Sequence, residues 1–152
     1  MLPELLLGFI AARKRCNVTR PANLPQMEPY LKLHLSANTG QNLFTGYGAG
    51  YVSVNRVRYE SNLIVLPDRI IEDWDVESFE QLAPEHFDFL ISLTPEMVLF
   101  GTGATLRFPH LKLTRMLIEA GIGIEVMDTS AACRTYNILT DEGRRVAAAL
   151  LI

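Results

Sequence analysis

The sequence predicts a single α/β domain in which helices pack on a mixed β-sheet. Its second half alternates between apolar strand-like runs and helix-like segments, and such alternation implies crossover connections with parallel strand pairing. Its first half contains a short turn between two alternating runs, which implies antiparallel pairing. The chain has 152 residues, of which 49% are hydrophobic and 20% charged, and these values fit one globular domain with its own core.

The first 26 residues are expected to lie outside the fold, which leaves residues 27–152 as the domain. An apolar run from Leu5 to Ala12 precedes three basic residues, whereas a secretory signal carries its positive charge before such a run. The run is also too short to span a bilayer, so we expect no direct membrane insertion. A mitochondrial transit peptide, a flexible tail and an upstream start with Met27 as the true first residue stay open as explanations.

The first strands are predicted from alternation. Residues 30–35 alternate between apolar and polar side chains, as a half-buried strand does. Residues 46–50 contain three glycines and are expected to be loosely ordered. Residues 51–54 and 57–60 alternate on either side of Asn55-Arg56, which predicts a hairpin because asparagine tolerates a positive φ.

A buried strand and the first helix follow. The apolar run 63–66 is continuous, which suits a central strand, and residues 69–74 resume the pattern after Pro67. Pro84 suits the first turn of a helix that runs to about Leu93, since its missing N–H needs no partner there.

The second half supplies the strand–helix alternation. Residues 97–100 predict a buried strand, and Pro109 and Gly121 mark the two ends of an amphipathic helix. Residues 123–127 predict another strand.

For the end of the chain, the sequence leaves both the start of one helix and the type of the last element open. Thr129 or Ser130 caps a helix that runs to about Leu139. The tail from residue 145 fits either a helix or a strand, although its alanines favour a helix by propensity.

The charge of the chain indicates which kinds of macromolecule it can bind. The net charge of −3 gives no basic surface for nucleic acid, so we expect no nucleic-acid partner. Residues 68–88 hold eight acidic side chains and one base, Arg69. This segment is either a solvated face or a docking surface for a basic protein.

Cysteine and histidine usage predicts neither a disulfide framework nor a metal site. Cys16 and Cys133 have no pair spacing, and the three histidines are scattered along the chain. We therefore expect a reducing compartment, namely the bacterial cytoplasm, or the mitochondrion if the chain is eukaryotic. We expect no cofactor, and the oligomeric state cannot be read from the sequence.

A small-residue turn offers one place for a ligand. Gly101-Thr102-Gly103 follows a predicted strand, and there backbone N–H groups can point at an anion beside a helix N-terminus. A dinucleotide-binding motif needs a third glycine where this chain has Leu106, although Asp128 stands where the motif has its acid. A tight turn that joins strand to helix explains the same residues without a ligand.

The segment from Asp128 to Asn137 carries the richest set of chemical groups. If Ser130 caps the helix, Cys133 lies in the first turn, where the helix dipole and Arg134 favour the thiolate. Cys133 is then a candidate nucleophile or redox group, with Arg134 as an anion clamp and Asp128 as a base or orienting acid. The alternative is that Cys133 is a small buried residue that faces the sheet.

The two segments share an edge if strands 97–100 and 123–127 are adjacent and parallel, and ligands bind at such edges of α/β sheets. The candidate pocket for an anionic ligand then consists of Gly101, Thr102, Gly103, Asp128, Thr129, Arg134 and Asn137.

A further set of residues matches the sequence pattern of a known protein family. The set comprises Tyr59 and Ser61 before an apolar strand, Trp74, Gly101-Thr102-Gly103, Met127-Asp128-Thr129, Ala132-Cys133-Arg134-Thr135-Tyr136-Asn137 and Glu142-Gly143-Arg144. Over roughly residues 30–152 the chain resembles a widespread domain family of unknown function that includes the mitochondrial NADH dehydrogenase (complex I) assembly factor 3.

The resemblance implies a three-layer α/β fold whose last strand runs against the others, so residues 145–151 become a strand. It implies no established enzymatic activity, and a role in assembling a membrane complex through protein contacts. One departure is Asn55-Arg56 at the hairpin, where the family leads us to expect Asn-Gly. The resemblance thus predicts a non-catalytic interaction or assembly domain. The residues themselves leave a small-anion-binding protein or a cysteine-dependent enzyme as the alternative.

Overall fold

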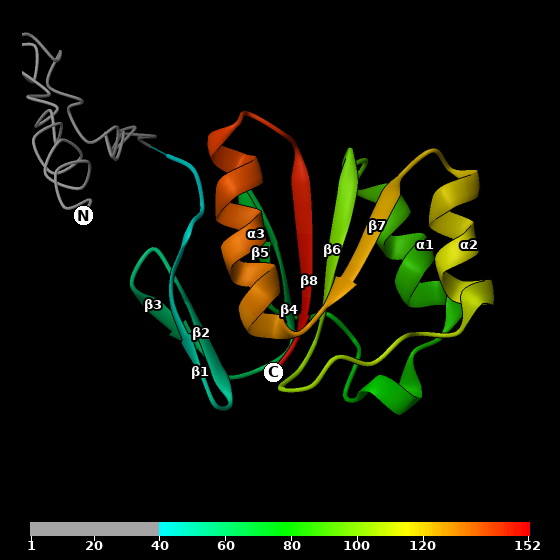
Figure 1. Cartoon of the computed structure of the whole chain (residues 1–152), viewed down its shortest axis with the longest axis horizontal. Coiled ribbons are helices and arrows are strands. Elements are labelled where there is room, and N and C mark those ends of the chain that lie inside the picture. The colour runs from blue at the N-terminus through cyan, green and yellow to red at the C-terminus, as the bar shows by residue number, and fades with distance from the viewer. Residues whose placement is uncertain (1–39) are drawn as a thin grey trace, which may run out of the picture. The chain divides into compact units, whose positions relative to one another are not determined.

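The computed structural model describes residues 40–152, which form two β-sheets and three α-helices (Figure 1). The predicted strand 30–35 and the N-terminal extension 1–26 lie outside these residues and stay predictions. The elements in chain order are β1 (Phe44–Gly48), β2 (Tyr51–Val54), β3 (Val57–Tyr59), β4 (Leu63–Leu66), β5 (Arg69–Ile71), the 3₁₀ helix η1 (Phe79–Gln81), α1 (Pro84–Ser92), β6 (Met97–Thr102), α2 (Leu111–Glu119), β7 (Gly123–Met127), α3 (Thr129–Asp141) and β8 (Val146–Leu151).

The larger sheet is mixed, as predicted, and its strand order is β5-β4-β8-β6-β7. Strands β6, β7 and β8 are parallel because α2 and α3 each carry the chain back to the end of the sheet at which the previous strand started. Strand β4 is antiparallel to both β8 and β5. The expectation that the last strand runs against the others is therefore wrong in part, since β8 is antiparallel to β4 but parallel to β6.

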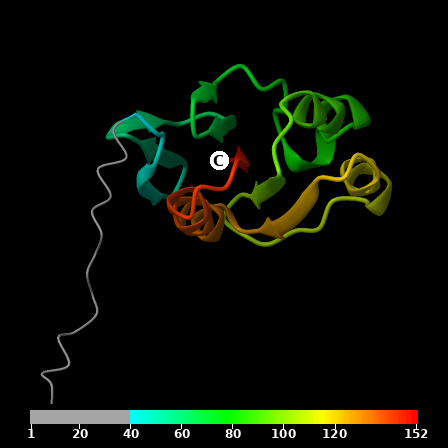
Figure 2. The ribbon, with the colours of Figure 1, turned by 90° about the horizontal axis from the view of Figure 1, so that it is seen from above.

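Helices cover both faces of this sheet, which confirms the three-layer prediction. Helices α1 and α2 lie on one face, while α3 and the three-stranded sheet lie on the other (Figure 2). In β4, Ile64 and Leu66 belong to the core under α1 and α2, whereas Leu63 and Val65 belong to the core under α3. A strand buried on both faces has no polar face, which explains why residues 63–66 are all apolar.

Strand β8 occupies the middle of the sheet and is likewise buried on both faces. Ala147 and Ala149 face one core, and Ala148 and Leu150 face the other. The structure confirms the strand that the family resemblance implies and overrides the helix propensity of alanine, because tertiary burial outweighs propensity.

The smaller sheet has the order β1-β2-β3 and is antiparallel throughout. The predicted hairpin at Asn55-Arg56 is present, and both residues are left-handed, with φ of 49° and 71°. Residues 46–50, expected to be loosely ordered, instead contribute to β1 and to a two-residue turn in which Gly50 has a φ of 74°. Pairing with β2 orders the glycines, which local pattern alone does not reveal.

The three helices begin close to where the sequence predicts. Helix α1 starts at Pro84, and a positive φ of 77° at Gly121 follows the end of α2. Helix α3 starts two residues earlier than a Ser130 cap implies, because Asp128 is its N-cap and accepts a 2.9 Å hydrogen bond from the N–H of Ala131 through Oδ1.

Candidate functional site

The carboxyl ends of β6 and β7 lie side by side, as the sequence predicts. The two strands are parallel neighbours, and Gly101 pairs with Met127 at the ends of the ladder. The Gly-Thr-Gly turn and the start of α3 therefore share one edge of the sheet. Beyond this edge the chain from β6 turns toward α2, whereas the chain from β7 turns toward α3 on the opposite face. Such a divergence is the usual position of a ligand crevice in an α/β sheet.

Hydrogen bonds between the two loops close this crevice. The N–H of Gly103 donates to Oγ1 of Thr129 at 2.9 Å, and the N–H of Thr129 donates to the carbonyl of Gly103 at 2.9 Å. The Thr129 hydroxyl in turn donates to the carbonyl of Leu151 at 2.6 Å. The Gly103 amide, which the anion hypothesis needs free, thus already has a partner in the fold.

Thr102 closes the same edge from within. Its side chain is fully buried, and Oγ1 lies 2.8 Å from the carbonyl of Thr105 and 3.3 Å from the carbonyl of Met127. The same oxygen accepts a hydrogen bond from the N–H of Arg107 at 3.0 Å. Thr102 therefore fixes the path of the loop that leaves β6, and its hydroxyl does not face an open pocket.

Gly101 is required here by packing. A Cβ at this position would stand 2.7 Å from Leu150 Cδ2 and 3.1 Å from the Cα of Thr129. Because the second of these is backbone, the start of α3 could not approach β6 so closely with any other residue.

Cys133 is fully buried in the core between α3 and the sheet. Burial raises the pKa of its thiol to about 12, and the nearby Arg134 only partly opposes this rise. The thiol is therefore neutral at neutral pH and lacks solvent access, which favours the structural interpretation over the reactive one. Asp128, the proposed base, is engaged as the cap of α3.

Arg134 and Asn137 face the three-stranded sheet. Nη1 of Arg134 donates to the hydroxyl of Tyr47 at 3.0 Å, and its guanidinium lies 5.6 Å from the centre of that ring. Asn137 accepts from the N–H of Phe44 at 2.9 Å and donates to its carbonyl at 2.8 Å. Asn137 lies eight residues beyond Thr129, about 12 Å along the helix, so the predicted set does not converge on one point.

A small hollow beside the N-terminus of α3 is bordered by Gly103 and Thr129 of the predicted set and by further residues that the sequence analysis missed. Its volume is about 70 Å³, well below the roughly 300–1,000 Å³ of pockets that hold a small-molecule ligand. Its walls come from the β1–β2 turn, the Gly103 turn and the start of α3, and include Tyr47, Tyr51 and Ser130. The sequence signal that could have predicted this tight hairpin is the pair of tyrosines that flank Gly-Ala-Gly.

A larger hollow of about 360 Å³ lies on the other side of Gly103 and Ala104. Arg107 lines it, but Nη1 of Arg107 is already paired with Glu80 at 2.7 Å, and its guanidinium lies over the ring of Phe79. Asn62, also in the wall, is bonded to the carbonyl of Val76 and to the N–H of Ile152. These polar groups hold the loops together.

Residues 40–152 contain neither a cluster of metal-ligand side chains nor a helix able to span a membrane. No group of three or more potential metal ligands comes together there. Likewise, no helix in this part of the chain has the length and apolar character of a membrane span.

These observations define a three-layer mixed α/β domain whose crevice edge is sealed by its own hydrogen bonds. The chain belongs to the family of proteins of unknown function termed DUF498/DUF598, whose model matches residues 44–151, and this confirms the resemblance seen in the sequence.

Two named relatives show the range of the similarity. The chain is 32% identical over 107 residues to the rat NADH dehydrogenase [ubiquinone] 1 alpha subcomplex assembly factor 3, which covers 69% of this chain and 57% of that protein. It is 28% identical over 109 residues to a "13 kDa major membrane protein" of Francisella tularensis, which covers 71% of this chain and 89% of that one. The chain thus spans about half the length of the assembly factors it matches.

A solved structure agrees with the fold. A crystal structure of a Bordetella parapertussis protein superposes with a TM-score of 0.70 at 39% identity, and covers 75% of this chain and 98% of that chain.

Proposed function

We propose that this domain works by binding another protein and performs no chemistry of its own. The observation that carries the proposal is a set of large apolar side chains held in solvent on α2 and on the loop before it. Phe108 is 74% exposed and Leu111 is 81% exposed. Leu106 and Ile118 are 51% and 62% exposed on the same segment. Apolar clusters of this kind mark protein interfaces.

A groove runs beside these side chains. It holds about 440 Å³ between η1 and the start of α2, and Phe79, Leu82, Pro109 and Leu113 contribute its apolar wall. Grooves with such walls accept apolar side chains of a partner, often from an amphipathic helix. We name the exposed side chains Leu106, Phe108, Leu111 and Ile118, together with this groove, the α2 surface.

The relatives support the same proposal. The mammalian proteins that match this chain are named as assembly factors, and assembly requires protein contacts. The candidate residues at the crevice edge support an anionic ligand or a cysteine enzyme less well, because their polar groups are engaged in the fold and the Cys133 thiol is buried.

The test is capture of partners by the tagged full chain from extracts of its source organism. The double variant Phe108→Ser/Leu111→Ser is the probe, since both side chains are exposed and their loss should leave the fold intact. Val57→Ser is the matched control, because Val57 is 54% exposed but lies on β3 in the other layer. We expect one or more proteins that the wild type and the control retain and the double variant loses. Identical recovery by all three chains would overturn the proposal.

A further inference from the structure

The outer side of the α1/α2 layer carries opposite charges on its two halves. Residues 73–88, which include η1 and most of α1, hold six acids and no base. Residues 107–118, which end the loop after β6 and include most of α2, hold three bases, one histidine and no acid. Because α1 and α2 pack side by side, the acidic half and the basic half of this layer adjoin (Figure 2).

The acidic half is turned to solvent. All six acids of residues 73–88 are exposed, and on α1 they are represented by Glu85 and Asp88. Within residues 40–152, neither of these two carboxylates forms an ion pair. Phe89, on the same side of α1, is 40% exposed.

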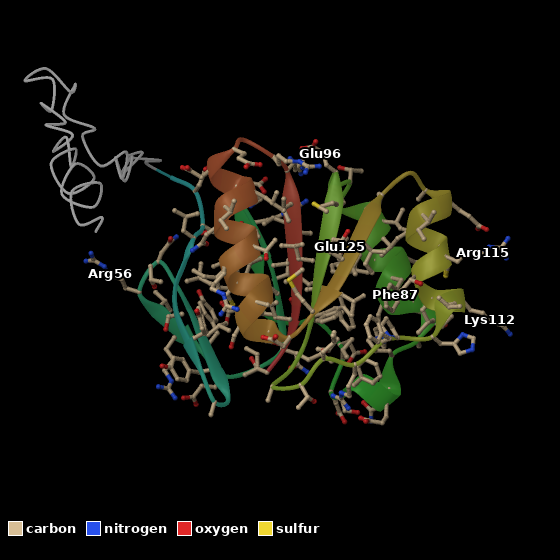
Figure 3. All side chains as sticks on the ribbon, in the orientation of Figure 1. Arg56, Phe87, Glu96, Lys112, Arg115 and Glu125 are labelled. Atoms are coloured by element: carbon tan, nitrogen blue, oxygen red, sulfur yellow. The ribbon has the colours of Figure 1, made fainter. Side chains whose placement is uncertain are left out.

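The basic half is turned to solvent as well. Lys112 and Arg115 extend from α2 away from the sheet (Figure 3). Arg115 pairs with Glu119 on its own helix at 2.6 Å, whereas Lys112 has no carboxylate partner among the described residues. The exposed Leu111 and Ile118 lie among these bases on the same helix.

The two halves meet at the apolar groove of the α2 surface. Glu80 contributes to one wall, and Arg107 and His110 contribute to the other. Among the ion pairs of residues 40–152, one connects the two halves, between Glu80 and Arg107 at 2.7 Å. Apolar side chains flanked by an acidic and a basic side are therefore left without a covering element in residues 40–152.

We infer that the α2 surface binds a second copy of this chain, in a two-fold symmetric dimer. The inference rests on the proposed function, and it names the partner at that surface. In a two-fold interface each patch meets its own copy, so residue i contacts j where j contacts i. A face with an acidic half and a basic half is self-complementary under that rotation, because each acidic half then opposes the basic half of the partner. The apolar side chains between the halves become buried in the middle of the interface, where interfaces concentrate their binding energy.

Sedimentation velocity of the full chain tests the inference, from micromolar to near-millimolar concentration. Two charge-reversal variants are made: Glu85→Lys/Asp88→Lys on the acidic half and Lys112→Glu/Arg115→Glu on the basic half. All four side chains are exposed, so both variants should keep the fold, which circular dichroism verifies. Asp141→Lys/Glu142→Lys is the matched control, since it places the same charge change at the end of α3 in the other layer.

We expect a wild-type dimer that weakens as salt is raised, because exposed charges are screened. Each reversal should raise the dissociation constant about tenfold or more, since every substitution acts twice in a two-fold interface. An equimolar mixture of the two reversed chains should restore association, because all acidic faces then meet all basic faces. The control variant should associate as the wild type does.

Three results would overturn the dimer: a monomer at every concentration, a dimer that both reversals leave unchanged, or reversed chains that fail to associate when mixed. None of them is a failure of the proposed function. A monomeric wild type that still captures a foreign protein through Phe108 and Leu111 overturns only the second copy as the occupant. A chain that neither dimerises nor captures a partner overturns both.

Discussion

Replacing Asn137 with alanine is expected to loosen the three-stranded sheet from the rest of the domain. The Asn137 carboxamide bonds both backbone groups of Phe44, accepting at 2.9 Å and donating at 2.8 Å, and so acts like one more residue in the ladder of β1. Phe44 is also packed against Tyr136 of the same helix, with ring centroids 5.1 Å apart. Asn137 is thus the polar half of a clamp between α3 and β1.

The magnitude follows from what alanine leaves behind. Two hydrogen bonds are lost, at about 1 kcal/mol each, and a backbone group that stays buried without a partner costs about 1–3 kcal/mol. These groups are only partly buried, so water can replace some of what is lost. We therefore expect Asn137→Ala to lower the free energy of unfolding by about 2–3 kcal/mol.

Urea unfolding followed by circular dichroism measures this change, and hydrogen exchange of the Phe44 amide reports it locally. Ile138→Ala is the control, because Ile138 is the next residue on α3 but is 61% exposed. It should change stability by less than about 0.5 kcal/mol. A loss for Asn137→Ala no larger than that of the control, with Phe44 still protected, would refute the clamp and return Asn137 to the set of candidate ligand residues.

Three other changes test the remaining features. The Cys133 thiol should resist labelling at neutral pH in the folded chain. Because burial raises its pKa from 9.0 to about 12, the free energy of unfolding should fall as the pH rises between these two values. Cys133→Ala should remove part of this pH dependence, as measured by urea unfolding. Thr129→Val should lower the free energy of unfolding by about 2–3 kcal/mol in thermal unfolding, because one buried and one partly buried hydrogen bond are lost. Thr129→Ser should recover most of this loss, and equal losses for the two variants would contradict the network. Arg56→Gly should raise the free energy of unfolding in urea by about 0.5–1 kcal/mol, since glycine relieves a φ of 71°, and an unchanged free energy would argue against strain at this turn.

Much of the architecture could be predicted because it is encoded in local periodicity. The strands at 97–100 and 123–127 and the helices beginning near Pro84 and Pro109 have apolar patterns that only one kind of element satisfies. The crossover rule then made β6 and β7 parallel neighbours, which correctly brought the Gly101–Gly103 turn to the start of α3.

The residue patterns by themselves predicted helices on a mixed sheet, the hairpin and the shared edge of β6 and β7, and the family resemblance implied the three layers. Only the tertiary structure decided whether that edge forms an open ligand pocket or is closed by hydrogen bonds. The reason is that the partners of Thr102, Thr129 and Asn137 are backbone groups far away in the chain. The Asn137 side chain, for example, bonds Phe44 at a sequence separation of 93 residues. Hydrogen bonds of this kind leave no periodic trace, since they depend on where whole elements come to rest, and the same threonines and asparagine would suit an open pocket equally well.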